Sequence, residues 1–279
     1  MKLALLVSIL AFFSKAQSLQ NLHENVLPSF KTCGLQSKSM QKSSGVGEFP
    51  WLVFIPLESR IPPIFPDKLR CAGVLINRRY VLTSIHCFQH YMTKVRLGQY
   101  NSMQNVTCSS RLGCDPVLEI DIEEKFGFKD VNIGVLRLAK NVQFSSYIQP
   151  ICLPFDSFSR AQLGETVYTS GWGEINFAGA YSFIPKKVKQ SILSNAECSN
   201  NRLTKTENDE GFMCLRYNRN SNDIPCRGDD GSPIMYRSST GQMVLEGILP
   251  HPYCTGKSVS EGIKIRSDFL TWLVEKMRP

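Results

Sequence analysis

Residues 80–87 read YVLTSIHC, a short strand-like run that ends in a turn carrying His86 and Cys87. Similar runs recur along the 279-residue chain, separated by Gly, Pro, Asn and Ser. Examples are residues 51–55, 73–76, 94–97, 133–138, 166–170, 232–236 and 243–249. Short strands at this spacing, without helices between them, predict an all-β barrel or sandwich.

The end of the chain follows a different pattern. Its apolar residues recur at helical spacing, at Phe269, Leu270, Leu273, Val274 and Met277. Ser267 or Asp268 precedes them and is a suitable helix cap. The sequence therefore predicts a C-terminal helix that docks on the β-structure.

Residues 1–16 predict an export signal. Lys2 gives a positive start, residues 3–13 are apolar, and small residues follow at Ser14 and Ala16. The apolar run is too short for a stable membrane span, although an uncleaved N-terminal anchor is the alternative. We expect a secreted, extracellular protein without a membrane span, in which residues 17–45 form a polar, extended arm.

Ten cysteines in an exported chain predict five disulfides. The chain has four histidines, His23, His86, His90 and His251, and no C-x-x-C pair. This composition argues against a metal site, and no cofactor is expected.

One glycosylation sequon, Asn105-Val106-Thr107, predicts a glycan on a surface loop, with an unmodified asparagine as the alternative. The net charge is +8, and Lys186, Lys187 and Lys189 form the densest basic cluster. We expect a solvated loop there rather than a site for an acidic partner or a glycan. Nothing in the sequence indicates nucleic-acid binding.

Residues 80–87 resemble the segment that carries the catalytic histidine in chymotrypsin-like serine proteases. Further segments resemble the same family, in the family's order: GEFPW at 47–51, CAGVLI at 71–76, VNIGVLRL at 131–138, CLP at 152–154, SGWGE at 170–174 and CRGDDGSP at 226–233. The resemblance covers residues 46–279. It implies two six-stranded antiparallel β-barrels with a C-terminal α-helix.

The resemblance also implies how the cysteines pair. The expected family bridges are Cys71–Cys87, Cys198–Cys214 and Cys226–Cys254, and Cys33–Cys152 would tether the arm to the domain. The remaining pair, Cys108–Cys114, resembles a small extra bridge in arthropod clip-domain proteases. A clip domain would need six more cysteines, and none precedes Cys33, so no clip domain is expected.

The catalytic positions depart from the family pattern. His86 matches the base, but Asn132 stands at the acid position and Asp230 at the nucleophile position. In serine proteases, loss of the nucleophile lowers kcat by about a million-fold, and an Asp-to-Asn change at the acid by about ten-thousand-fold. We therefore expect no catalysis. A weakly active site rearranged around Asp130 or Ser232 is the alternative.

Other features of the family site are also altered. Asp229 matches the aspartate that receives the new N-terminus on activation, but no basic residue leads into an aliphatic-Gly-Gly start between Cys33 and Gly47. Ile224 stands at the specificity-pocket position, and Pro252 lies near a glycine that a substrate would cross. Proline cannot donate a backbone hydrogen bond, so we expect this cleft to hold a peptide poorly.

We expect the Asp230 carboxylate to lie near His86 and the backbone N–H of Gly228, the former oxyanion donor. It would then fill that hole as a built-in anion, whereas a splayed, solvated pair is the alternative. The tripeptide Arg227-Gly228-Asp229 matches an adhesion motif. We interpret it as a coincidence, because the fold buries that aspartate.

The favoured interpretation is a secreted, catalytically inactive serine protease homologue that acts by binding. The resemblance suggests a monomeric regulatory cofactor or decoy in an extracellular protease cascade, such as one of arthropod innate immunity. Its partners would be extracellular proteases or their zymogens. A weakly active endopeptidase and a carbohydrate-binding secretory protein are the alternatives.

Overall fold

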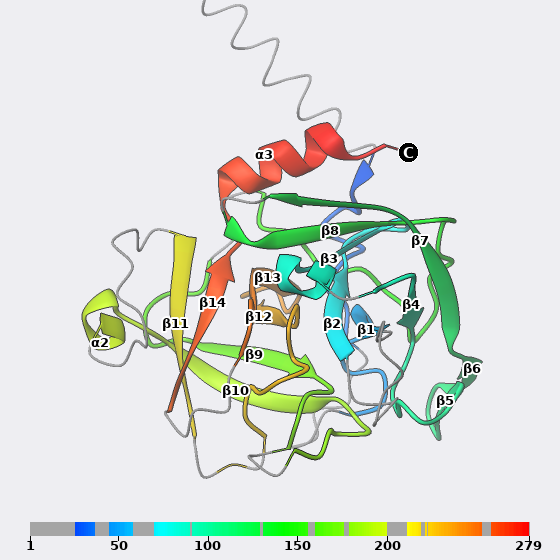
Figure 1. The fold of residues 1–279 in the computed structure, drawn as a ribbon, viewed down its shortest axis with the longest axis horizontal. Helices are drawn as coiled ribbons and strands as arrows, with labels where there is room; N and C mark the ends of the chain where they lie inside the picture. The colour runs from blue at the N-terminus through cyan, green and yellow to red at the C-terminus, as the bar shows by residue number, and fades with distance from the viewer. Residues whose placement is uncertain are drawn as a thin grey trace, which may run out of the picture.

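Two closed antiparallel β-barrels lie side by side, with a helix at the C-terminal end (Figure 1). The computed structural model describes residues 26–36, 45–57, 70–89, 91–128, 131–155, 160–175, 179–199, 211–218, 221, 223–252 and 258–278. The predicted all-β, chymotrypsin-like architecture is therefore confirmed.

The first barrel has the strand order β1-β2-β3-β8-β7-β4. Its strands are β1 (Leu52–Pro56), β2 (Arg70–Leu75), β3 (Tyr80–Ser84), β4 (Lys94–Leu97), β7 (Leu118–Phe128) and β8 (Ile133–Leu138). All five residues of β3 and all six of β8 are buried. They form the centre of the main core.

The second barrel has the order β10-β11-β14-β13-β12-β9. Its strands are β9 (Thr166–Gly171), β10 (Lys186–Leu193), β11 (Phe212–Tyr217), β12 (Pro233–Arg237), β13 (Met243–Ile248) and β14 (Val259–Lys264). Buried contacts join the two barrels. Trp51 donates through Nε1 to Met235 Sδ at 3.0 Å, and the rings of Phe54 and Trp172 meet edge to face at 5.4 Å.

A two-stranded ribbon and three helical segments complete the described fold. The ribbon is β5 (Val106–Ser109) with β6 (Gly113–Pro116). The helical segments are the 3-10 turn η1 (Ile85–Gln89), α2 (Asn195–Ser199) and α3 (Ser267–Lys276). The turn η1 follows β3 and lies in the middle of the view in Figure 1.

Helix α3 confirms the predicted C-terminal helix but not its predicted cap. Ser267 and Asp268 lie inside the helix, and the cap residue is Arg266, which makes no side-chain capping hydrogen bond. Phe269, Leu270, Leu273 and Val274 form the buried face, at the predicted helical spacing. No helix among the described residues is long and apolar enough to cross a membrane.

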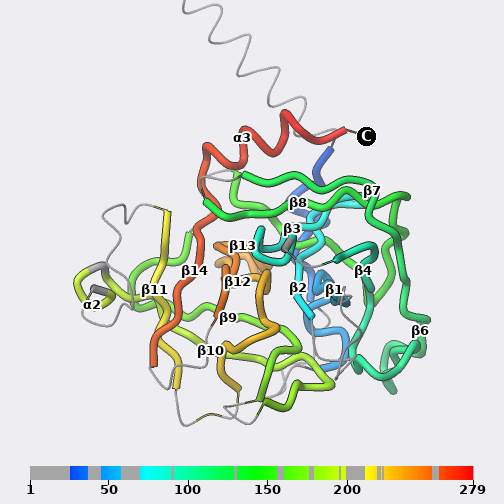
Figure 2. The backbone as a smooth tube through the Cα atoms, in the orientation of Figure 1, coloured from blue at the N-terminus to red at the C-terminus, as the bar shows by residue number. Residues whose placement is uncertain are grey.

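Four of the five expected disulfides are present: Cys33–Cys152, Cys71–Cys87, Cys108–Cys114 and Cys198–Cys214. Cys226 is disulfide-bonded, but Cys254 lies outside the described residues. The first of these bridges ties residues 26–36 to the domain. That segment, drawn in blue, lies beside the C-terminal end of α3, where Val26 and Arg278 line one shallow depression (Figure 2). The expected export signal, residues 1–16, lies outside the described residues.

The basic cluster is not the solvated loop expected from the sequence. Lys186 begins strand β10 and is only 3% exposed, and Lys187 is half-buried. Only Lys189 is exposed as expected. The prediction was wrong because Lys186 shares the buried face of the strand with Val188 and Gln190, two and four residues on.

Candidate functional site

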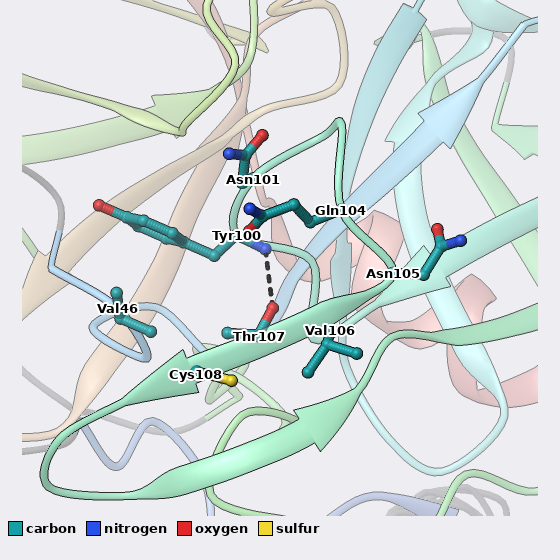
Figure 3. Close-up of a pocket in the computed structure, with 8 residues that line it drawn as sticks. All are labelled: Val46, Tyr100, Asn101, Gln104, Asn105, Val106, Thr107 and Cys108. Atoms are coloured by element: carbon teal, nitrogen blue, oxygen red, sulfur yellow. Dashed lines mark hydrogen bonds between the residues drawn. The ribbon is translucent and has the colours of Figure 1, made fainter.

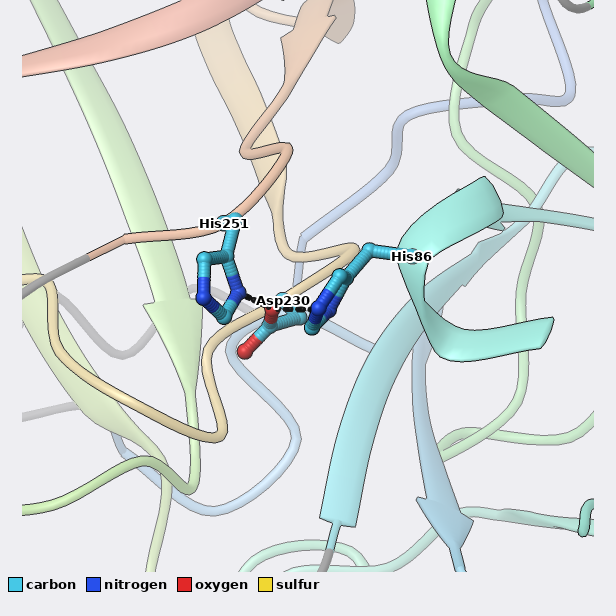
Figure 4. A group of neighbouring side chains, drawn as sticks. All are labelled: His86, Asp230 and His251. Atoms are coloured by element: carbon cyan, nitrogen blue, oxygen red, sulfur yellow. Dashed lines mark hydrogen bonds and ion pairs between the residues drawn. The ribbon is translucent and has the colours of Figure 1, made fainter. Parts of the chain in front are cut away.

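His86, Asp230 and His251 come together between the two barrels (Figure 4). Asp230 Oδ1 lies 3.0 Å from His86 Nδ1 and 2.5 Å from His251 Nδ1. The two imidazole rings lie 3.9 Å apart, centroid to centroid. The carboxylate side chain is 7% exposed, whereas the two rings are 28% and 30% exposed. One buried carboxylate oxygen thus faces two partly exposed imidazoles.

Ser84 holds the two histidine-bearing segments in place. Its Oγ accepts a hydrogen bond from the N–H of His86 at 3.1 Å and donates to the carbonyl of Pro250 at 2.7 Å. Ser84 ends β3, directly before η1, while Pro250 directly precedes His251. This one hydroxyl therefore links the turn that carries His86 to the segment that carries His251.

Asp230 is held by the loop that connects Cys226 to β12. Its backbone carbonyl accepts from the N–H of Ala72 at 2.7 Å, and the next residue, Gly231, donates to the carbonyl of Leu249 at 2.8 Å. Gly231 has a φ of 81°, and a Cβ there would lie 2.2 Å from the Ala72 carbonyl oxygen. Only glycine fits this position.

The second carboxylate oxygen of Asp230 accepts a hydrogen bond from the backbone N–H that was expected from the sequence as the oxyanion donor. Oδ2 accepts a hydrogen bond from the N–H of Gly228 at 3.1 Å. The expected contacts of Asp230 with His86 and with Gly228 are therefore both present. The alternative, in which Asp230 and His86 point apart into solvent, does not occur in this structure.

The orientation of His86 differs from that of a working triad. In the triad, the base faces the nucleophile through Nε2 and the orienting acid through Nδ1. Here Nδ1 of His86 lies against Asp230, at the nucleophile position. At the acid position, Asn132 has a φ of 55°, which asparagine tolerates, and its carbonyl accepts from the N–H of Ile85.

Of the two residues considered as substitute catalytic groups, the structure describes Ser232. Ser232 has no exposed surface, and its backbone is fixed by hydrogen bonds to Asp229 and Leu249. Asp130 lies outside the described residues.

Asp229, the aspartate matched by sequence to the activation pocket, pairs with a cation from this same chain. Lys186 Nζ lies 2.6 Å from Asp229 Oδ2, and the two side chains are 2% and 3% exposed. The ammonium also donates to the carbonyls of Glu174 and Ile224 at 2.8 Å each, so its three N–H groups have three acceptors. The N–H groups of Gly173 and Cys226 donate to the Asp229 carboxylate.

Sequence reasoning missed the role of Lys186. The available signal was the strand alternation that places Lys186 on the same side as Val188. Because Asp229 is 2% exposed, Arg227-Gly228-Asp229 does not present an adhesion motif.

The positions expected to form the substrate cleft are packed. Ile224 is 3% exposed and forms an apolar cluster with Val188 and Tyr217. Pro252 is also buried. Tyr181 lies close enough to Gly228 that a Cβ on that glycine would meet its ring at 2.6 Å. Burial, followed by the Glu174 carboxylate, raises the pKa of the Tyr181 hydroxyl above its usual value of 10.

A second depression of about 550 Å³ lies away from the histidines, beside the β5–β6 ribbon (Figure 3). It is lined by Val46, Tyr100, Asn101, Gln104, Asn105, Val106, Thr107 and Cys108. Asn105, the expected glycosylation site, is exposed at its rim. Burial, followed by the Glu48 carboxylate, raises the pKa of the Tyr100 hydroxyl. Among the described residues that line it, none is an aspartate, glutamate, lysine, arginine or histidine.

Comparisons with known proteins agree with this architecture. The sequence model of the family described as trypsin matches residues 40–273. CLIP domain-containing serine protease B9 of Anopheles gambiae is 30% identical over 75% of this chain and 55% of its own length. Serine protease 7 of Drosophila melanogaster is 30% identical over 91% of this chain and 70% of its own length. Phenoloxidase-activating enzyme 1 of Spodoptera litura is 29% identical over 83% and 65%. The chain thus spans little more than half of the first of these relatives.

Proposed function

The chain belongs to the trypsin family of chymotrypsin-like serine proteases, and we propose that within this family it acts by binding rather than by cutting peptide bonds. The observation that carries the proposal is Asp230 at the nucleophile position, with one carboxylate oxygen on His86 and the other on the N–H of Gly228. A carboxylate in this place offers no hydroxyl for acyl transfer.

The charge of Asp230 also opposes the chemistry of the family. Serine proteases stabilise the oxyanion of the transition state with preorganised N–H donors. In this chain the Gly228 donor already holds a buried carboxylate. A developing oxyanion would meet a negative charge at the place where it needs a donor, and this supports loss of hydrolysis independently of the missing hydroxyl.

The Lys186–Asp229 ion pair supports the inference that this chain reaches its final conformation without an activating cleavage. In the family, activation supplies a new N-terminus to the aspartate before the nucleophile. Here the ammonium of Lys186 lies 2.6 Å from that aspartate within the uncut chain. We infer that the loop carrying Asp230 takes its final form on folding, without a zymogen stage.

The setting that we propose is an extracellular protease cascade, such as one of arthropod innate immunity, in which the chain is a regulatory cofactor or decoy. Four disulfides favour an oxidising compartment, in agreement with residues 1–16 as an export signal. The names of its relatives include phenoloxidase-activating proteins of Spodoptera litura and Holotrichia diomphalia. Proteases or their zymogens are therefore the partners that we propose for a monomer with residues 46–279 as its folded domain and residues 17–45 as a tethered arm.

The alternative is a weakly active endopeptidase with a rearranged site. The complete burial of Ser232 disfavours it, because a nucleophile must reach the substrate. A fluorophosphonate probe, which labels activated serines covalently, distinguishes the two. We expect no labelling of the natural chain under conditions that label an active member of the family fully. Stoichiometric labelling would contradict the proposal, and its loss in Ser232→Ala would identify the rearranged site.

Capture experiments test the binding half of the proposal. The purified chain, immobilised through its C-terminus, is exposed to the fluid into which it is secreted, and bound proteins are identified by mass spectrometry. We expect a trypsin-family protease or zymogen to be enriched over a matrix that carries an unrelated disulfide-bonded protein. Enrichment of glycan-bearing proteins alone would favour the carbohydrate-binding alternative.

A further inference from the structure

We propose that His86, Asp230 and His251 form a binding site for a zinc ion. The composition argues against a metal site, because these residues lie far apart along the chain and match no metal-binding spacing. In the structure their ligand atoms all lie within 4.8 Å of one another. The proposal does not depend on whether the chain retains catalysis.

The donor set suits zinc. Two imidazole nitrogens and one carboxylate oxygen are the protein ligands of many three-ligand zinc sites, in which water takes the fourth position. Ligand atoms of a tetrahedral zinc ion, at bond lengths of about 2.0–2.1 Å, lie about 3.3 Å apart. The Nδ1 atoms of His86 and His251 lie 3.0 Å and 2.5 Å from Asp230 Oδ1. Side-chain shifts of less than about 1 Å would therefore admit the ion.

The protons of the two rings can move to make room for the metal. Without a metal, Nδ1 of His251 is hydrogen-bonded to Asp230 Oδ1, and Nδ1 of His86 lies 3.0 Å from the same oxygen. A bound zinc ion needs both Nδ1 lone pairs, so each neutral ring then carries its proton on Nε2 instead. The rings are 28% and 30% exposed, which lets solvent mediate the proton shift.

The ligands are oriented before any metal arrives. Asp230 Oδ2 is fixed by the N–H of Gly228, which directs Oδ1 toward the two histidines. Such outer contacts commonly orient the carboxylates that bind metals. His251 stands between Pro250 and Pro252, whose rings limit the backbone, and Ser84 ties its segment to η1. Little conformational entropy would be lost on binding.

Two nitrogen ligands and a single carboxylate favour zinc over calcium and magnesium. Calcium takes six to eight oxygen ligands, and magnesium demands octahedral oxygen coordination, whereas this site offers two nitrogens. Another grouping of possible ligands, Cys198, Cys214 and Glu261, carries no proposal because its two cysteines form a disulfide.

The test uses the full secreted chain after removal of metals with a chelator. Isothermal titration with Zn²⁺ is expected to give one ion per chain, and Co²⁺ substitution is expected to give the intense visible absorption of a tetrahedral site. Ca²⁺ and Mg²⁺ at the same concentrations should give no heat. No Zn²⁺ binding by the natural chain would overturn the proposal and leave a purely hydrogen-bonded cluster.

Two variants locate the site. His251→Gln and Asp230→Asn each remove one ligand and keep a side chain of similar size. Each should weaken Zn²⁺ binding by more than the roughly 10- to 100-fold that loss of an outer-shell partner costs. His23→Gln, which removes a histidine of the N-terminal arm, is the matched control and should bind as the natural chain does. Unchanged binding in His251→Gln, or lost binding in His23→Gln, would place the metal elsewhere and overturn the proposal.

Separate measurements report on folding, on the position of the metal and on catalysis. Circular dichroism shows whether each variant is folded, and His251→Gln decides the matter if Asp230→Asn is not, because His251 is a partly exposed side chain. Anomalous diffraction at the zinc edge then gives the ion's position. Fluorophosphonate labelling is measured on the metal-free chain, so a failure of the zinc site and a failure of the non-catalytic proposal give different results.

Discussion

Lys186 and Asp229 form a buried ion pair at the start of the loop that carries Asp230. Both side chains are nearly inaccessible to solvent, and each has further hydrogen-bond partners besides the other. Removing one partner of a buried ion pair leaves an uncompensated charge, which costs far more than the pair itself contributes. The loop that carries Asp230 directly follows Asp229, so the pair also governs the position of the candidate site.

Lys186→Met is expected to lower the free energy of unfolding by about 3–5 kcal/mol, because it leaves the Asp229 carboxylate buried without its cation. Urea unfolding monitored by tryptophan fluorescence measures this loss. Lys189→Met, on the exposed face of the same strand, is the control and should change stability by less than about 0.5 kcal/mol. Equal effects of the two substitutions would contradict the role given to Lys186.

The sequence could predict part of the candidate site at this scale. The expected contacts of Asp230 followed from the family's loop geometry, since Gly228 and Asp230 are two residues apart. His251 could not be predicted as the third member. Its approach depends on the packing of one barrel against the other, and Pro250-His251-Pro252 was interpreted only as a damaged substrate strand. His251 is 165 residues from His86 and 21 from Asp230, and no local sequence pattern predicts contacts at such separations.

Among the elements, strands with continuous apolar runs were predicted within one to three residues of their observed ends. Both ends of β4 and of β8 were correct. Strands β5, β6, β7, β10, β11 and β14 were not among the predicted examples. Of these, β7 is half-exposed and charged, although Leu118, Ile120 and Ile122 alternate with Glu119, Asp121 and Glu123. That alternation is typical of a strand with one solvated face. The cap of α3 was wrong because no side chain caps this helix.

The β5–β6 ribbon presents the sequon. Asn105 precedes β5 and is exposed, whereas Thr107 is buried, donating to the carbonyl of Gly98 at 2.6 Å and accepting from the N–H of Tyr100 at 3.2 Å. The acceptor asparagine is thus accessible, and the threonine also serves the fold. A glycan on Asn105 would stand at the rim of the depression beside the ribbon.

We expect the chain secreted from mammalian cells to lose mass on treatment with peptide-N-glycosidase F. Asn105→Gln should abolish this loss, because it removes the acceptor. Thr107→Ser is the matched control: it preserves the sequon and both hydrogen bonds of the hydroxyl, so the glycan should remain. Mass spectrometry measures each change. A natural chain without a removable glycan would favour the unmodified asparagine.

For the whole molecule, two barrels share one main core, and the arm is joined to the domain by a covalent bond. Cys33 and Cys152 are buried with Val244 in a small apolar cluster, and the N–H of Gly34 donates to the carbonyl of Pro150 at 2.8 Å. The bridge therefore fixes the described part of the arm, residues 26–36, against both the β12–β13 region and the segment before β9. The barrel architecture was predictable, since many family landmarks occur in order along the chain.

The disulfides should differ in what they contribute to stability, because they close loops of very different length. Cys33–Cys152 spans 119 residues and Cys108–Cys114 spans 6. Loop-closure entropy gives about 4.7 kcal/mol for a loop of about one hundred residues and about 2 kcal/mol for a loop of about six. We therefore expect the double substitution Cys33→Ala with Cys152→Ala to cost about twice as much unfolding free energy as Cys108→Ser with Cys114→Ser. Urea unfolding of both variants measures the difference. An equal or larger loss from the ribbon bridge would mean that the arm contributes little to the stability of the folded domain, and that its tether serves another purpose.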